Sequence, residues 1–370
     1  MPTSPPDRPT LPPTVWPARG RHVGSGAEDL LLRTLRQRRD SGAVDAFLEP
    51  PEDEDGPGPR VFEARWTVAG DGGEDVTVRA RLTLAPGSAG GQEWTLVAEA
   101  EGPWDPAWPS PAAVFWPEDP DVPWDRDAAT GLRLRGINTL PDDDRTVRRL
   151  LRDAARHSWQ IHVVVHEAMT PDHRGRMPLA GWLPPGLRHR VVEHRAAPQQ
   201  LRAANWALQD HGVQLPRGGA VVLPGTPAPA GHDPQAFTVR SVFLDGSEPA
   251  DLIAAVTRFA ALDRPLPEGA EEALAALREE WRLLTLEEEL ARERRLVAMY
   301  AEALEAMTRS RDLYREAAER ANEALAACRD SARAAEPSRA VLPRRFLTRT
   351  LERLRSLRPG PGPGPAGPGN

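Results

Sequence analysis

The sequence predicts an α/β protein with a mixed, largely parallel sheet, preceded by an N-terminal antiparallel β-meander and followed by a long C-terminal helix or coiled coil. Three patterns predict this architecture. Apolar residues alternate with period two over residues 61–100, short apolar runs alternate with helical patterns over 132–262, and a heptad pattern follows residue 286. Proline- and glycine-rich ends predict disordered termini.

The first 48 residues predict a disordered segment followed by a short helix. Residues 1–20 are rich in proline, which favours disorder. Within residues 21–48, the run AEDLLLRTLRQRRD at 27–40 places its leucines on one face, as in an amphipathic helix. The acidic, proline-rich run EPPEDEDGPGP ends this segment.

Residues 60–131 predict a β-meander followed by a loop rich in tryptophan and proline. Strands are expected at 61–68, 76–84 and 94–100, with glycine-containing turns between them. The middle strand has one apolar and one polar face, so we expect one packed and one solvated face. We expect the loop tryptophans to cover the packed face, and an aromatic binding platform is the alternative. These residues are Trp104, Trp108, Trp116 and Trp124.

Residues 132–262 predict an α/β domain. The continuous apolar character of the runs VVV and VVL is typical of strands buried on both faces of a parallel or mixed sheet. A further extended run, GLRLRGINTL, precedes the first helix. Strands are expected at 161–167, 189–194, 220–223 and 237–244, and helices at 144–157, 198–210 and 249–261.

Short motifs across residues 143–262 carry a family resemblance. They are IHVVV at 161–165, RVVEH at 190–194, PRGGAVVLPG at 216–225 and FTVRSVFLDGSEP at 237–249. Their order resembles the C-terminal part of FtsK/HerA-type P-loop motor domains. The resemblance implies that Arg190 and Arg217 match family arginines, which in an active motor reach nucleotide phosphates.

The chain departs from that family in its phosphate chemistry. All 47 basic residues are arginine, so no lysine is present to reach the β- and γ-phosphates of a nucleotide. Ile137 and Asn138 occupy the place where the acidic Walker B pair is expected. The resemblance therefore implies a degenerate relative that does not hydrolyse nucleotide, and we expect no cofactor.

A set of histidines suggests an alternative, a histidine-metal hydrolase. His162 and His166 share one face of the strand expected at 161–167, and Glu167 ends it. A metal hydrolase uses two or three histidines and a carboxylate around an open position. The competing interpretation is that these histidines belong to the core or rim of a sheet.

Residues 268–330 predict a long helical segment, interrupted near Thr285. From Leu286 a heptad can be written whose a and d positions are mostly apolar, with Glu293 and Arg311 as breaks. A helix with such a seam needs a partner, so residues 286–328 predict self-association or a protein partner. The seam residues are Leu290, Val297, Tyr300, Leu304, Met307 and Tyr314.

Residues 331–370 predict a short basic helix at 341–358 and a disordered proline- and glycine-rich tail. The basic helix suggests a further alternative, an accessory DNA-binding subunit of a motor complex. A solvated or protein-docking face is the competing interpretation. Its leading arginines are Arg344, Arg345, Arg349 and Arg353.

The amino-acid composition limits the classes of protein to which this chain can belong. The net charge of −7 argues against a surface devoted to nucleic acid. A single cysteine, Cys328, excludes a disulfide framework and fits a reducing compartment, and no run is long enough to span a membrane. We therefore expect a cytoplasmic, non-catalytic interaction or scaffold protein that acts through its long helix.

Overall fold

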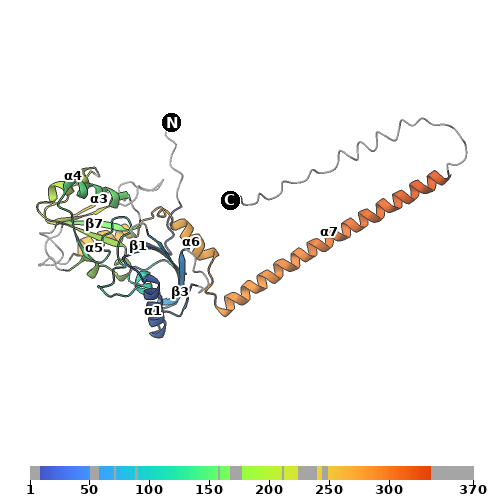
Figure 1. Ribbon diagram of the computed structural model, residues 1–370, viewed down its shortest axis with the longest axis horizontal. Coiled ribbons are helices and arrows are strands. Elements are labelled where there is room, and N and C mark those ends of the chain that lie inside the picture. The colour runs from blue at the N-terminus through green and yellow to red at the C-terminus, as the bar shows by residue number, and fades with distance from the viewer. Residues whose placement is uncertain are drawn as a thin grey trace, which may run out of the picture. The chain divides into compact units, whose positions relative to one another are not determined.

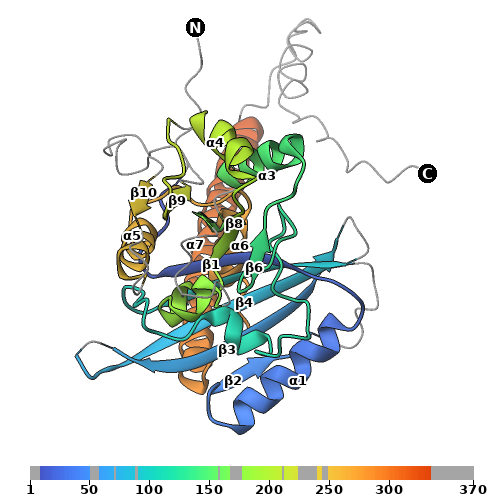
Figure 2. The ribbon, with the colours of Figure 1, turned by 90° about the vertical axis from the view of Figure 1, so that its left-hand side faces the viewer.

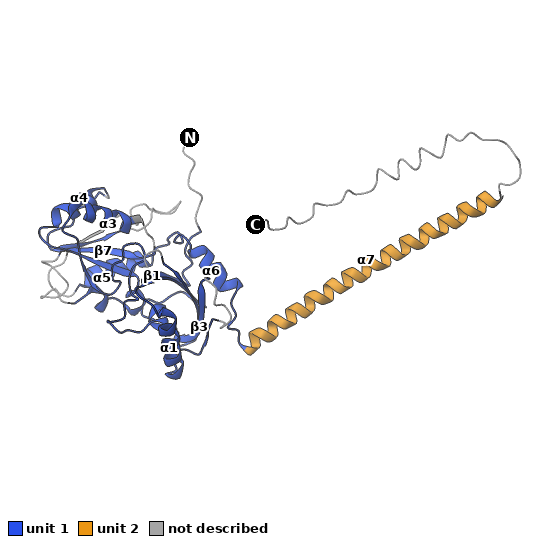
Figure 3. Cartoon of the chain, viewed as in Figure 1, with its two compact units in different colours: residues 1–285 blue, residues 286–370 orange. Residues whose placement is uncertain are grey.

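The computed structural model describes residues 9–50, 58–70, 72–87, 91–156, 159–166, 177–210, 212–223, 240–243 and 249–334. The chain divides into two compact units, residues 1–285 and residues 286–370 (Figures 1 and 3). The first unit contains two five-stranded sheets. None of the helices in the described ranges has the length and apolar composition needed to cross a membrane. The basic helix expected at 341–358 lies outside the described residues.

The first sheet is antiparallel throughout and has the order β1-β5-β4-β3-β2. Strands β3, β4 and β5 are the predicted meander, which is confirmed. Two further strands extend it, one at each edge. The five strands are β1 (Val15–His22), β2 (Ala46–Leu48), β3 (Arg60–Ala69), β4 (Asp75–Pro86) and β5 (Gln92–Ala100).

The prediction of disorder for residues 1–20 is wrong for the described residues from 9 onward. Strand β1 pairs with β5 along its whole length, from Val15 opposite Glu99 to His22 opposite Gln92. Proline is tolerated on an edge strand, because one side of that strand donates no ladder hydrogen bonds. Trp16 is 1 % exposed, and its burial stabilises a segment whose composition alone favours disorder.

The predicted N-terminal helix is confirmed as α1 (Ala27–Asp40). Its buried residues Leu31 and Leu35 join the core of the first sheet with Phe62 of β3. Acidic residues begin the helix and arginines end it, an arrangement that favours the helix dipole.

The tryptophan- and proline-rich loop covers the packed face of this sheet, as predicted. Trp108, Trp116 and Trp124 are buried in the same core, and Trp104 packs against it. The rings of Trp116 and Trp124 stack with centroids 5.6 Å apart. One short helix, α2 (Pro111–Phe115), lies within the loop.

The second sheet is mixed and has the order β10-β9-β7-β8-β6. Strands β6, β7 and β8 are parallel, while β9 runs antiparallel to both of its neighbours, β7 and β10. The predicted mixed sheet is therefore confirmed. Its strands are β6 (Ile137–Thr139), β7 (Ile161–His166), β8 (Val191–Ala196), β9 (Gly219–Leu223) and β10 (Arg240–Phe243).

Helices cover both faces of the second sheet (Figure 2). On β7, Val164 packs with α3 and α4, whereas Val163 and Val165 pack with α5 on the opposite face. This alternation explains the continuous apolar run, because successive strand residues enter opposite layers. The helices are α3 (Asp144–Arg156), α4 (Leu201–Gln209) and α5 (Ala250–Ala260).

One predicted extended run, at residues 131–140, is mostly not a strand in the structure. The run GLRLRGINTL forms only the three-residue strand β6, because Asn138 turns the chain back on itself: its Nδ2 donates to the carbonyl of Arg133 at 2.9 Å. The predicted boundary between a meander at 60–131 and an α/β domain at 132–262 stays a prediction. Val192 of β8 belongs to the core of the first sheet, and both sheets lie in one compact unit.

The helical region after residue 268 is two helices rather than one segment. The predicted interruption near Thr285 is confirmed, because α6 (Ala270–Glu279) ends before α7 (Leu286–Ala334) begins. However, α6 belongs to the first unit: Leu274 and Leu277 pack against Val97 of β5. This contact covers part of the sheet face that was expected to be solvated.

Candidate functional site

The apolar seam of α7 is the largest run of exposed apolar side chains in the described part of the chain. Among the side chains described for α7, residues 286–333, none is buried. The seam side chains are between 53 % and 76 % exposed. Apolar side chains at this spacing along 49 helical residues are typical of a helix that packs against another helix. The seam residues are Leu290, Val297, Tyr300, Leu304, Met307 and Tyr314.

Two ion pairs within α7 lie outside the apolar seam of the helix. Ion pairs within α7 join Arg309 to Glu305 at 2.8 Å and Arg315 to Glu319 at 3.1 Å. All four residues lie outside the a and d positions. Such pairs stabilise a solvated helix face by only a few tenths of a kcal/mol each. The two charged seam positions are Glu293 at d and Arg311 at a.

The predicted metal ligands do not form a metal site in the described residues. His162 and His166 lie on β7, and both are buried. The Nδ1 of His162 lies 2.9 Å from Nε2 of His194 on the neighbouring strand, so one ring donates to the other. Within the described part of the chain, no group of three or more histidine, cysteine, aspartate or glutamate side chains is placed to hold a metal ion. Glu167 lies outside the described residues.

A buried ion pair lies beside these histidines. Glu193 and Arg195 on β8 are 3 % exposed, and Nε of Arg195 donates to the Glu193 carboxylate at 2.8 Å. The same carboxylate accepts the backbone N–H of Leu179 at 2.7 Å, and Arg195 donates to the carbonyl of Met177 at 2.6 Å. These bonds anchor the segment before β8 to the sheet, which is a structural role.

The two arginines of the family resemblance lie in different environments. Arg190 immediately precedes β8 and is 5 % exposed, with its guanidinium 6.0 Å from the ring centroid of Trp16. Arg217 is exposed and precedes β9. The structure therefore separates them by burial, and only Arg190 borders a cavity.

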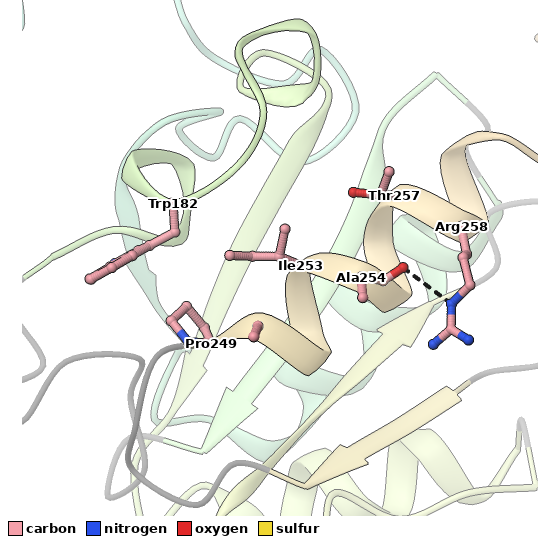
Figure 4. Close-up of a pocket in the computed structure, with 7 residues that line it drawn as sticks. Trp182, Pro249, Ile253, Ala254, Thr257 and Arg258 are labelled. Carbon is pink, nitrogen blue, oxygen red and sulfur yellow. Dashed lines mark hydrogen bonds between the residues drawn. The ribbon is translucent and has the colours of Figure 1, made fainter. Parts of the chain in front are cut away.

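A shallow apolar hollow of about 520 Å³ lies on the outer side of α5, bordered by Trp182 (Figure 4). Its walls are mainly the apolar side chains of Pro249, Ile253 and Ala254. The guanidinium of Arg258 donates to the carbonyl of Ala254 at 3.3 Å, and the other polar lining groups are the Thr257 hydroxyl and the indole N–H of Trp182. These groups supply neither a nucleophile and base nor a set of metal ligands.

Sequence reasoning placed His189 and His194 in a cluster of histidines but did not predict their burial, and it missed the buried Arg264. The pairing of His162 with His194 depends on strand order and register, which the spacing of histidines along the chain does not reveal. Arg264 follows α5 in a short loop, and nothing in the local sequence indicates that its side chain is buried.

Comparison with known proteins finds no family, no curated protein and no solved structure that matches this chain. The resemblance to FtsK/HerA-type motor domains therefore stays a prediction, as does an accessory DNA-binding role for Arg344, Arg345, Arg349 and Arg353, which lie outside the described residues.

Proposed function

We propose that this protein is a non-catalytic scaffold that self-associates through α7, with two copies packed as an antiparallel coiled coil. The observation that carries the proposal is the exposed seam of α7, on which every described side chain is at least partly accessible. An apolar stripe of this length is normally covered by another helix. A second copy is favoured because the charges within the seam complement each other in one antiparallel register.

In that register the two-fold axis crosses the pair of helices at the level of residue 302. Glu293 at a d position then lies opposite Arg311 at an a position of the second copy, so both breaks in the seam become ion pairs. The remaining layers are all apolar: Leu286 with Ala318, Leu290 with Tyr314, Val297 with Met307, and Tyr300 with Leu304.

Other alignments of the same helices leave Glu293 and Arg311 without an oppositely charged residue in the second copy. In a parallel, in-register dimer each seam position faces its own copy, so Glu293 faces Glu293 and Arg311 faces Arg311. Sliding the antiparallel pair by one heptad places both charges opposite apolar or aromatic side chains. Partially buried like charges and unpaired charges are destabilising, so the register centred on Glu302 is favoured.

The dimer would join two copies of the first unit through the starts of their α7 helices. In this register the two Leu286 residues, where α7 begins, lie about 48 Å apart along the helix axis at 1.5 Å per residue. A spacer of this kind joins two copies without any nucleotide chemistry, in agreement with the absence of lysine.

A charge exchange tests the proposal. Glu293→Arg or Arg311→Glu alone converts both interchain pairs into like-charge pairs, and we expect each to raise the dimer dissociation constant by at least about ten-fold. The combined variant restores opposite charges and should return the constant to near the wild-type value. Light scattering coupled to size exclusion and analytical ultracentrifugation measure the mass of the full chain.

Matched controls make the same charge changes on the opposite side of the helix. Glu302→Arg and Arg309→Glu lie at f positions, so neither should alter the dissociation constant. A wild-type chain that is monomeric at micromolar concentration would overturn self-association. A combined variant as weak as the single ones would overturn the antiparallel register.

Cys328 provides an independent measure of orientation. Its side chain is exposed at a d position, so a parallel dimer would place the two thiols in contact and oxidation would cross-link them. In the proposed register the two Cys328 residues lie roughly 78 Å apart along the axis. We therefore expect no disulfide-linked dimer after mild oxidation, and rapid, quantitative cross-linking would contradict the antiparallel arrangement.

A further inference from the structure

A cavity of about 210 Å³ lies in the first unit, separate from α7. Four segments that are distant in the sequence form it: the chain before β1, the loop between β5 and α2, the segment before β8, and the end of α5. Most of its wall is apolar. The apolar lining includes Leu11, Pro12, Val15, Trp16, Pro106 and Leu262.

Arg190 lies in the wall of this cavity with an uncompensated charge. It is 5 % exposed, and neither Nε nor Nη2 of its guanidinium has a hydrogen-bond partner. The contact with the face of Trp16 is weaker than the hydration that the buried cation has lost. Asp263 also lines the cavity, but Nε and Nη2 of Arg190 donate no hydrogen bond to its carboxylate.

A second buried cation lies close to the first. Arg264 is 5 % exposed, its Nε and Nη2 also have no hydrogen-bond partner, and its guanidinium lies 5.9 Å from the ring centroid of Phe259. Burial and then the charge of Arg264 hold the pKa of Arg190 well below its usual value. Burial lowers the pKa of Arg264 itself to about 10.

One more buried donor borders the cavity. The indole Nε1 of Trp104 is buried without an acceptor, although Trp104 lines the same space. The unsatisfied groups that line the cavity are thus N–H donors, namely Nε and Nη2 of Arg190 and Nε1 of Trp104. Buried donors and cations of this kind normally have an acceptor, and an anionic ligand would supply one.

We propose that this cavity, the arginine pocket, binds a small carboxylic acid with an apolar body, whose carboxylate is held by the guanidinium of Arg190. Carboxylate geometry matches the planar fork of a guanidinium. The apolar wall favours an apolar body over a bare inorganic anion. A cavity of 150 Å³ holds benzene, so the arginine pocket accommodates a ligand of about eight to ten non-hydrogen atoms.

Benzoate, benzamide and inorganic phosphate probe the arginine pocket in the full-length protein. We expect benzoate to raise the melting temperature in a saturable way and to give a one-to-one isotherm in calorimetry, because binding to the folded state stabilises it. Benzamide has the same shape without the charge and should have no effect. Equal binding of benzamide would overturn the role of the charge, and equal or tighter binding of phosphate would overturn the apolar body.

Two substitutions test whether benzoate binds at Arg190. Arg190→Met should abolish the response to benzoate and raise the melting temperature of the ligand-free protein, because it removes an uncompensated buried charge. Arg258→Met, an exposed arginine on α5, should leave the response unchanged. If Arg190→Met does not fold, Trp104→Phe removes the indole donor while keeping an aromatic ring, and it should weaken benzoate binding several-fold. An undiminished response in a folded Arg190→Met protein would overturn the proposal.

Discussion

Buried histidines make the first unit sensitive to acid. His189 and His194 are 1 % and 0 % exposed, and neither ring nitrogen of His189 has a hydrogen-bond partner. Burial, followed by the charges of Arg135 and Arg188, lowers the pKa of His189 to about 3. Burial, followed by the charge of His162, lowers the pKa of His194 to about 3. Both rings are therefore neutral in the folded protein at neutral pH.

These shifts predict that stability falls as the pH decreases from about 6.5 towards 3. In the unfolded chain the histidines titrate near their ordinary value of about 6.5, so the unfolded state binds more protons over that range. Each histidine should cost about 2 kcal/mol of unfolding free energy between pH 8 and pH 5. Urea denaturation at the two pH values measures this difference.

The substitution His189→Phe isolates one contribution. Phenylalanine keeps a flat ring against Trp124, whose centroid lies 5.1 Å from that of His189, and no hydrogen bond is lost. We expect the pH-dependent loss between pH 8 and pH 5 to shrink by about 2 kcal/mol, with stability at pH 8 unchanged or higher. An unchanged pH dependence would mean that His189 is protonated or solvated in the folded protein.

Local sequence patterns predict whether a side chain is buried better than they predict which side chain it contacts. The alternation in β4 correctly indicates that Val78, Ala80 and Leu82 are buried. The same reasoning places His162 on a strand but does not predict His194 as its neighbour, because that contact requires the parallel alignment of β7 with β8. Of the residues that line the proposed arginine pocket, the sequence selected Arg190 and Trp104, each for a different reason.

At the scale of elements, α6 is held on the first sheet by polar contacts. Glu63 of β3 is 0 % exposed, and its carboxylate accepts the backbone N–H groups of Arg282 at 2.9 Å and Leu283 at 3.1 Å. Arg81 of β4 donates to the carbonyl of Ala276 at 3.0 Å and lies 3.5 Å from Glu63. A buried carboxylate thus stabilises the end of the first unit.

We predict that Glu63→Gln lowers the unfolding free energy by about 2–3 kcal/mol. The amide cannot replace the charge opposite Arg81, and one of its two polar atoms is a donor that faces backbone N–H groups. Guanidinium denaturation measures the loss, and faster trypsin cleavage after Arg282 should accompany it. Glu74→Gln, at an exposed turn of the same sheet, should change stability by less than about 0.5 kcal/mol. Equal effects of the two substitutions would contradict the proposed role of Glu63.

Helices were easier to predict than edge strands. The bounds of α1 agree with the predicted 27–40, because its apolar spacing and its acidic and basic ends indicate the same limits. Strand β1 was missed because six prolines within residues 5–17 outweighed a short apolar pattern, and its stability depends on pairing with β5, which begins about 70 residues later.

At the scale of the whole chain, buried contacts are confined to the first unit. The described core clusters extend from Val15 to Trp281, and none includes a residue of α7. The sequence separated α7 from the rest correctly, since the interruption near Thr285 marks the boundary. The joining of the two sheets into one unit was not predictable from the spacing of apolar residues alone. It depends on contacts between distant segments, such as the 2.7 Å hydrogen bond that Trp16 Nε1 donates to the carbonyl of Gly186.

This confinement predicts that a chain ending at Thr285 folds without α7. None of the described buried apolar contacts is removed, so the melting temperature should stay within about 2 °C of the full-length value, which corresponds to less than ~1 kcal/mol for a unit of this size. Far-ultraviolet circular dichroism should lose the signal of the 49 residues of α7, and light scattering should show a monomer at concentrations where the full chain is dimeric. A drop of more than about 5 °C would show that α7 stabilises the first unit, and a dimeric truncated chain would place the association elsewhere.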